Sequence, residues 1–151
     1  MEIAQFDVLV ESLRRASAAS LAKYGFPLIE GLTVTGDEVT KVETRLGVAL
    51  PEKYKAFMVH YGGGMFGTVD LFPISRHGTD HDDDLASVND REFPDRTFIA
   101  VAPVGTGDHW GFPVTNGQCH DEVWFRFHDV GDPELHAVDF LEFVARHGLR
   151  A

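Results

Sequence analysis

The chain has 151 residues, 44% of them hydrophobic and 25% charged, which is ordinary for a globular protein and excludes a disordered chain. Its 13 basic and 24 acidic residues give a net charge of −11, which repels a phosphate backbone and favours a basic partner. The single Cys119 excludes an internal disulfide framework. We expect a cytoplasmic protein, because we find neither a signal-peptide pattern nor an apolar run that could span a bilayer.

The N-terminal residues predict an amphipathic helix over 1–23. Its apolar side chains recur at spacings of three and four, which describes one buried face of a helix. These side chains are Ile3, Phe6, Val10 and Leu13. Glycine and proline interrupt the periodicity over 24–34, so we interpret residues 1–34 as a helical extension and connector that packs onto the domain.

A helical hairpin is predicted next. Thr35 followed by Glu38 matches a capping box, and Gly47 stands where a left-handed residue ends a helix. Pro51 then begins the following helix, because proline at the first helical position has a preset φ and no donor to lose. The glycine run 62–64 ends it. Its apolar face is formed by Tyr54, Phe57, Met58 and Tyr61.

Beyond this run the apolar period falls toward two, which predicts β-strands. We expect strands at 65–73, 97–104, 110–114 and 122–128. The polar stretch 76–96 holds one short helix at 84–90, and the last three strands form an antiparallel meander. A final helix begins after Asp139, has Glu142 as its capping partner and ends near Gly148.

These elements predict the α+β fold class: N-terminal helices, an antiparallel sheet of about four to six strands, and a C-terminal helix packed on the sheet. One face of the strand at 122–128 belongs to the core, with Val123, Phe125 and Phe127. The other face is expected to be more accessible and carries Trp124, Arg126 and His128.

The segment TGDEVTKVETRLGVALPEKYKAFMVHYGGG resembles the opening of SUKH domains. That opening has a capped helix, a Leu-Gly, a Leu-Pro, an aromatic-rich helix and an Asn-Gly-Gly-like end. The likeness is carried by Leu46-Gly47, Leu50-Pro51, Tyr54, Phe57 and Gly62-Gly63-Gly64. Tyr61 stands where Asn is more typical. The strand VWFRFHD and the segment 139–143 resemble the later strand and closing helix, so the likeness covers residues 35–148 and leaves the N-terminal helix as an addition.

The resemblance implies binding rather than catalysis. The family includes a yeast regulator of cell-wall assembly and bacterial immunity proteins that neutralise polymorphic toxins, often nucleases. We therefore expect a non-enzymatic protein-binding domain without a cofactor. The first hypothesis is an immunity protein whose partner is a toxin domain with a basic surface, and the second is a regulatory or scaffolding module. Nucleic acid and membranes are not expected partners, and the matching residues are caps and core positions that carry over no binding role.

An acidic segment is the first candidate for partner binding, because it holds seven acidic residues and one basic residue between Asp80 and Asp95. Apolar anchors are needed beside it, since charge complementarity raises association rate more than affinity. The candidate partner-binding residues are Asp80, Asp82, Asp83, Asp84, Asp108, His109, Trp110 and Trp124. Two alternatives stay open for each tryptophan: an exposed anchor, or a side chain turned inward. We expect this loop to be exposed, so charge reversal at 82–84 should slow association and weaken its salt dependence with little loss of stability.

Two catalytic interpretations are less favoured. A metal-dependent hydrolase could use His77, His81 and the aspartates at 82–84, but their spacing matches neither a helical zinc motif nor a calcium-binding loop, so we expect a solvated loop and no metal. Cys119-His120-Asp121 suggests a thiol nucleophile, yet neighbours on an extended chain point to opposite sides. No catalytic residue is therefore predicted.

Overall fold

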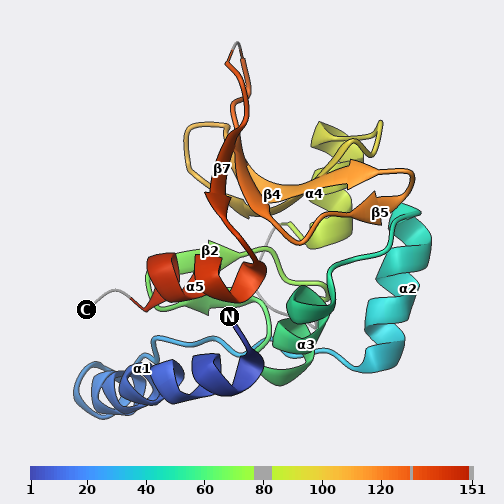
Figure 1. The fold of residues 1–151 in the computed structure, drawn as a ribbon. Coiled ribbons are helices and arrows are strands. Elements are labelled where there is room, and N and C mark those ends of the chain that lie inside the picture. Colours follow the sequence, from blue (N-terminus) through green and yellow to red (C-terminus); the bar gives the residue numbers. More distant parts are fainter. Residues whose placement is uncertain (77–82, 130, 150–151) are drawn as a thin grey trace.

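The computed structural model describes residues 1–76, 83–129 and 131–149, and these form five helices and two antiparallel sheets (Figure 1). The helices are α1 (Ile3–Tyr24), α2 (Gly36–Leu46), α3 (Glu52–His60), α4 (Leu85–Glu92) and α5 (Phe140–Gly148). The strands are β1 (Gly64–Phe66), β2 (Val69–Leu71), β3 (Phe98–Pro103), β4 (His109–Thr115), β5 (Gln118–Cys119), β6 (Val123–Arg126) and β7 (Glu134–Ala137). The predicted α+β class is confirmed.

The predicted ends of α2 and the predicted start of α5 are present in the structure, whereas Pro51, predicted at the first helical position, is the N-cap of α3 with a ψ of 142°. Thr35 Oγ1 accepts a hydrogen bond from Glu38 N at 3.2 Å, and the Glu38 carboxylate accepts one from Thr35 N at 3.1 Å, which completes the capping box of α2. Gly47 ends α2 with a φ of 72°. At α5, Asp139 accepts from Glu142 N at 2.8 Å, while the Glu142 carboxylate accepts from Val138 N.

The single strand predicted at 65–73 is wrong, because this segment folds as the β1–β2 hairpin with Phe66 opposite Val69. The chain reverses at Gly67, which has a φ of 61°. A Cβ atom at Gly67 would lie 1.9 Å from the carbonyl oxygen of Gly148, so the tight reversal also depends on the end of α5. That dependence is long-range and leaves no trace in local periodicity.

The main sheet has the order β3-β4-β6-β7, with β5 paired to β4. Strands β5 and β7 were not predicted, because two and four residues are too short to show a period. Helices α3 and α5 pack on one face of this sheet through aromatic side chains. Tyr54 of α3 has its ring centroid 5.5 Å from that of Phe112 and 5.0 Å from that of Phe140. This inner face is the centre of the core.

Helix α1 packs onto the domain, as predicted, through Phe6 and Val10, which are both fully buried. The Phe6 ring contacts Phe57 at 5.8 Å and Tyr61 at 5.4 Å between centroids. The Tyr61 hydroxyl also donates a hydrogen bond to the Asp7 carboxylate. The N-terminal extension therefore shares its core with the hairpin of α2 and α3.

Gly67→Ala tests the contact between the β1–β2 turn and α5. We expect it to lower the free energy of unfolding by at least about 2 kcal/mol more than Gly105→Ala, measured by denaturant unfolding. Both glycines have a positive φ, 61° and 91°, but a Cβ atom at Gly105 would meet nothing within 4 Å. The control thus carries the backbone strain alone, and equal losses for the two variants would contradict the steric explanation.

Candidate partner-binding groove

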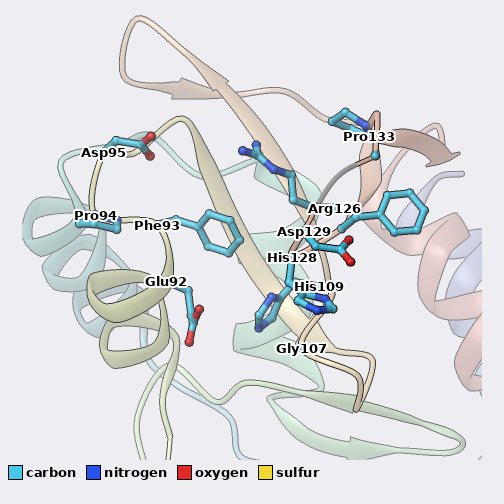
Figure 2. A pocket seen from close by; sticks show the side chains of 12 residues that line it. Glu92, Phe93, Pro94, Asp95, Gly107, His109, Arg126, His128, Asp129 and Pro133 are labelled. Atoms are coloured by element: carbon cyan, nitrogen blue, oxygen red, sulfur yellow. The ribbon is translucent and has the colours of Figure 1, made fainter.

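A polar groove of about 520 Å³ lies on the outer face of the main sheet, away from α3 and α5 (Figure 2). Trp110 and Phe112 of β4 face the core helices, so alternation turns His109 and Gly111 of the same strand outward. His109 pairs with Arg126 of β6 in the sheet register, so both residues line the groove from its floor. Its walls include Glu92, Phe93, Asp95 and Asp129.

Helix α4 forms one wall of the groove, and buried Asn89 holds it against β3. The Asn89 side chain donates to Ala100 O at 2.9 Å and accepts from Ala100 N at 2.7 Å, so its amide satisfies both backbone groups of one buried strand residue. Nδ2 also donates to Leu85 O within the helix. The predicted helix at 84–90 is confirmed and extends to Glu92, which brings Phe93 to the groove.

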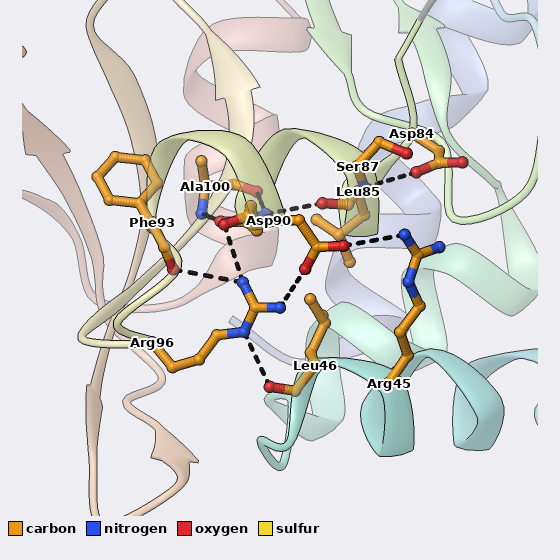
Figure 3. Close-up of polar contacts among 10 residues, drawn as sticks. Arg45, Leu46, Asp84, Leu85, Ser87, Asp90, Phe93, Arg96 and Ala100 are labelled. Carbon is orange, nitrogen blue, oxygen red and sulfur yellow. Dashed lines mark hydrogen bonds and ion pairs between the residues drawn. The ribbon is translucent and has the colours of Figure 1, made fainter.

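The connector behind α4 is clamped by Arg96 (Figure 3). Its guanidinium donates to the carbonyl oxygens of Leu46 at 3.0 Å and Asn89 at 2.8 Å, which joins the ends of α2 and α4. Asp90 receives hydrogen bonds from both Arg96 and Arg45, and these two cations, Arg96 first, lower the pKa of Asp90. The positive φ of Arg96, 56°, belongs to this clamp.

Arg126 is the central cation of the groove. Its guanidinium carbon lies 5.7 Å from the Phe93 ring centroid and 5.6 Å from that of Phe98. The two ring centroids are 5.1 Å apart, so Arg126 makes cation–π contacts with an aromatic pair. Within the described part of the chain, Arg126 has no hydrogen bond and no ion pair. Its N–H donors are thus available to a ligand.

Asp108 fixes one end of the groove. Its carboxylate accepts from His128 N at 2.8 Å, lies 2.6 Å from His128 Nδ1 and accepts from Thr106 Oγ1 at 2.8 Å. These hydrogen bonds, those of the His128 side chain first, lower the pKa of Asp108 to about 2, and the same carboxylate raises the pKa of His128. The predicted site residue Asp108 therefore orders its loop.

His109, the next predicted residue, is half-buried beside Phe93, at 5.6 Å between ring centroids. Burial lowers the pKa of His109, so the ring is neutral at pH 7. It offers a neutral hydrogen-bonding ring next to the cationic Arg126.

The described part of the acidic segment is largely engaged within the chain. Asp83 forms two hydrogen bonds with Arg91, at 3.1 and 3.4 Å. Asp84 is the N-cap of α4, accepts from Ser87 N at 2.8 Å and has a side chain only 16% exposed. The expectation of an exposed loop is therefore wrong for Asp84. Removing its carboxylate would remove the N-cap hydrogen bond of α4 and lower the free energy of unfolding by about 1 kcal/mol.

The remaining acidic and metal candidates lie outside the described residues. These are His77, Asp80, His81 and Asp82. Over residues 1–76, 83–129 and 131–149, no group of three or more His, Cys, Asp or Glu side chains is arranged to hold a metal ion. The roles expected of the four residues above stay predictions.

The two candidate tryptophans lie on opposite faces of the sheet. Trp110 turns inward, with its ring centroid 5.3 Å from that of Phe143 and 5.0 Å from that of His147. Trp124 shares the outer face with Arg126 by alternation along β6. Its indole nitrogen is buried and has no hydrogen-bond partner among the described residues. The structure thus groups Trp124, but not Trp110, with the groove face.

Cys119 lies on the inner side of β5 and is 7% exposed. Burial raises the pKa of its thiol to about 12, so the thiol is protonated at neutral pH. His120 is exposed and contacts Thr115 Oγ1 at 2.7 Å. The two side chains therefore point apart, as expected for neighbours on a strand.

Sequence reasoning missed the groove walls. Arg126 was placed on the accessible face of its strand, but nothing local linked it to Phe93, which follows a different element. The Phe93-Pro94-Asp95 sequence could have indicated a groove wall, because it follows the short helix α4 and places an aromatic ring and a carboxylate next to each other.

The fold and the groove define a small α+β domain with a polar groove on one open sheet face. The family model of SUKH_6, SMI1-KNR4 cell-wall, matches residues 36–144, and the chain belongs to this family. At the family level it is therefore a protein-interaction or immunity-type domain, of a kind that is generally non-catalytic. No curated protein matches the chain. Among the described helices, none has both the length and the apolar character required to cross a membrane.

Asn89→Ala tests how α4 builds the groove wall. It leaves the buried N–H and C=O of Ala100 without their side-chain partner, so we expect the free energy of unfolding to fall by about 2–4 kcal/mol. Ser87→Ala on the same helix removes a hydroxyl with no hydrogen bond in the described residues and should cost less than about 0.5 kcal/mol. Denaturant unfolding measures both, and similar losses would contradict the anchoring role of Asn89.

Asp108→Asn tests the ion pair at the end of the groove. We expect the pKa of His128 to fall toward about 6.5, followed by imidazole NMR signals across a pH titration. His136 is the internal control, because its lowered pKa arises from burial and from Arg146. A His128 pKa unchanged by the substitution would show that Asp108 does not set it.

The stabilisation from this pair has a defined pH window. Because the pKa of His128 is raised by folding, its contribution is complete below about pH 6.5 and is lost as the pH rises through the raised value. Because the pKa of Asp108 is lowered, its contribution is complete above about pH 4 and is lost as the pH falls toward 2. The stability difference between the wild type and Asp108→Asn should therefore be largest between these limits.

Proposed function

We propose that this chain is an immunity-type protein that binds a cell-delivered toxin domain in the cytoplasm and blocks its active surface. The observation that carries the proposal is the groove on the open sheet face, in a domain of the SUKH family. Its rim presents the carboxylates of Glu92, Asp95 and Asp129 around one stacked arginine. The groove therefore combines acidic side chains, a concave surface and the aromatic ring of Phe93.

The overall charge supports a basic partner. A net charge of −11 attracts a positively charged surface over long range and raises the association rate. A toxin domain that cleaves nucleic acid needs a basic cleft for the phosphate backbone, and such a cleft is complementary to this protein. Close contact then requires buried anchors, and Phe93 at the groove wall is of the residue type that supplies them.

A regulatory module is the second candidate, favoured by the family description, SMI1-KNR4 cell-wall. Such a module would use the same groove for a partner made by the same cell. It would bind no toxin, so a toxin-binding measurement distinguishes the two candidates.

The proposal is tested with the purified toxin domain encoded beside this chain. We expect a stable complex in size-exclusion chromatography and loss of toxin activity at equimolar protein. The double variant Glu92→Lys and Asp129→Lys should slow association about tenfold at low salt and flatten its salt dependence, because it reverses the charge of the rim. Stopped-flow or surface-based kinetics at several salt concentrations measure this.

The matched control is Glu11→Lys with Asp37→Lys. It changes the net charge by the same amount, but Glu11 lies on α1, at the opposite end of the molecule from α4, and Asp37 at the start of α2 (Figure 1). Equal slowing by both double variants would place the interface outside the groove. Absence of both complex and inhibition with the wild type would refute toxin binding.

A further inference from the structure

Arg126 lies in a groove rich in carboxylates, yet it has no hydrogen bond and no ion pair within residues 1–76, 83–129 and 131–149. Two of the three neighbouring acids are held by other donors: Asp95 accepts from Thr97 N at 3.1 Å and from Thr97 Oγ1 at 3.0 Å. Glu92 accepts from Arg91 Nε at 3.2 Å. The hydrogen bonds of these two acids therefore go to groups other than Arg126, although the charge of Arg126 adds to the lowering of the pKa of Asp95 after the Thr97 hydrogen bonds.

The guanidinium also has two aromatic neighbours. Its carbon lies over the Phe93 and Phe98 rings, at 5.7 and 5.6 Å from their centroids, and these cation–π contacts use none of its N–H groups as hydrogen-bond donors. Gly111 lies next to one of these rings: a Cβ atom there would lie 2.0 Å from the carbonyl oxygen of Ile99 and 2.8 Å from the Phe98 ring. A planar guanidinium already in contact with two rings has less conformational freedom to lose on binding, and its fork of donors matches the two oxygens of a carboxylate.

We infer that Arg126 binds a carboxylate that the partner presents between basic residues, with the fork on the carboxylate and the groove rim on the flanking cations. This inference rests on the proposed function. A single negative charge fits Arg126, whereas the three acidic side chains on the same walls, Glu92, Asp95 and Asp129, repel a dianion more strongly than a monoanion. Hydrogen bonds from Thr97, its backbone N–H first, lower the pKa of Asp95 and keep that carboxylate charged at neutral pH. The same acids attract lysine or arginine on either side of the bound carboxylate.

The probe is the tripeptide Ac-Lys-Asp-Lys-NH2, titrated at millimolar concentrations into the ¹⁵N-labelled full chain. We expect a saturable shift of the Arg126 Nε–Hε NMR signal, which reports directly on the guanidinium. Ac-Lys-Asn-Lys-NH2 keeps the cations but lacks the carboxylate and should leave this signal in place. Absence of a shift with the aspartate peptide, or an equal shift with the asparagine peptide, overturns the inference. An equal shift with inorganic phosphate also overturns it, in favour of a general anion site.

Two variants connect this site to the partner. Arg126→Gln removes the fork, and Arg126→Lys keeps the charge but not the planar pair of donors, so each should weaken the toxin complex about tenfold or more, mainly through faster dissociation. Unfolding midpoints within error of the wild type for Arg126→Lys confirm that its fold is intact. Wild-type affinity in both variants would overturn the inference while leaving toxin binding intact. A peptide response in a protein that binds no toxin would refute toxin binding and leave the carboxylate site at Arg126 intact.

Discussion

The docking of α4 onto β3 is the constraint on which the rest of the outer surface depends. Asn89 gives the buried backbone of Ala100 the hydrogen bonds that a neighbouring strand would give, and it does so at an edge of the main sheet. A helix in this place covers β3 and stops at Glu92, so the outer face of β4 and β6 stays open. The groove is the boundary between the covered and the open parts of one sheet face.

Structural features that depend on residues close together in the sequence were predicted, whereas features that depend on contacts between distant residues were not. The caps at Thr35 and Asp139 need only a partner three residues away, so they can be recognised without a structure. The reversal at Gly67 depends on the carbonyl of Gly148, which belongs to the last helix. The contact of Arg126 with the Phe93 ring likewise depends on how α4 is held against β3. The side-chain amide of Asn89 holds it there, and a single buried residue leaves no periodic pattern in the sequence.

Three acidic side chains near α4 form hydrogen bonds within the chain. Asp83, Asp84 and Asp90 form hydrogen bonds with arginines or with a helix N-terminus, so they mainly stabilise the fold around α4. Their charge still contributes to the long-range field, which acts within about 8 Å at physiological salt and steers encounter. Under the proposed function, short-range contact with a partner falls to groups whose donors are not already engaged, and Arg126 is such a group. The proposed binding surface therefore combines high acidity with one cationic anchor.

The N-terminal helix and the unusual residue at the end of α3 are one structural feature. Tyr61 stands where an asparagine is more typical of the family, and its ring and hydroxyl contact Phe6 and Asp7 of α1, outside the matched residues 36–144. The guanidinium of Arg14 lies 5.5 Å from the same ring. A short polar residue at this position could not reach α1 in this way, so the tyrosine and the added helix depend on each other. Because α1 lies at the opposite end of the molecule from α4, this addition extends the core and leaves the open sheet face unchanged (Figure 1).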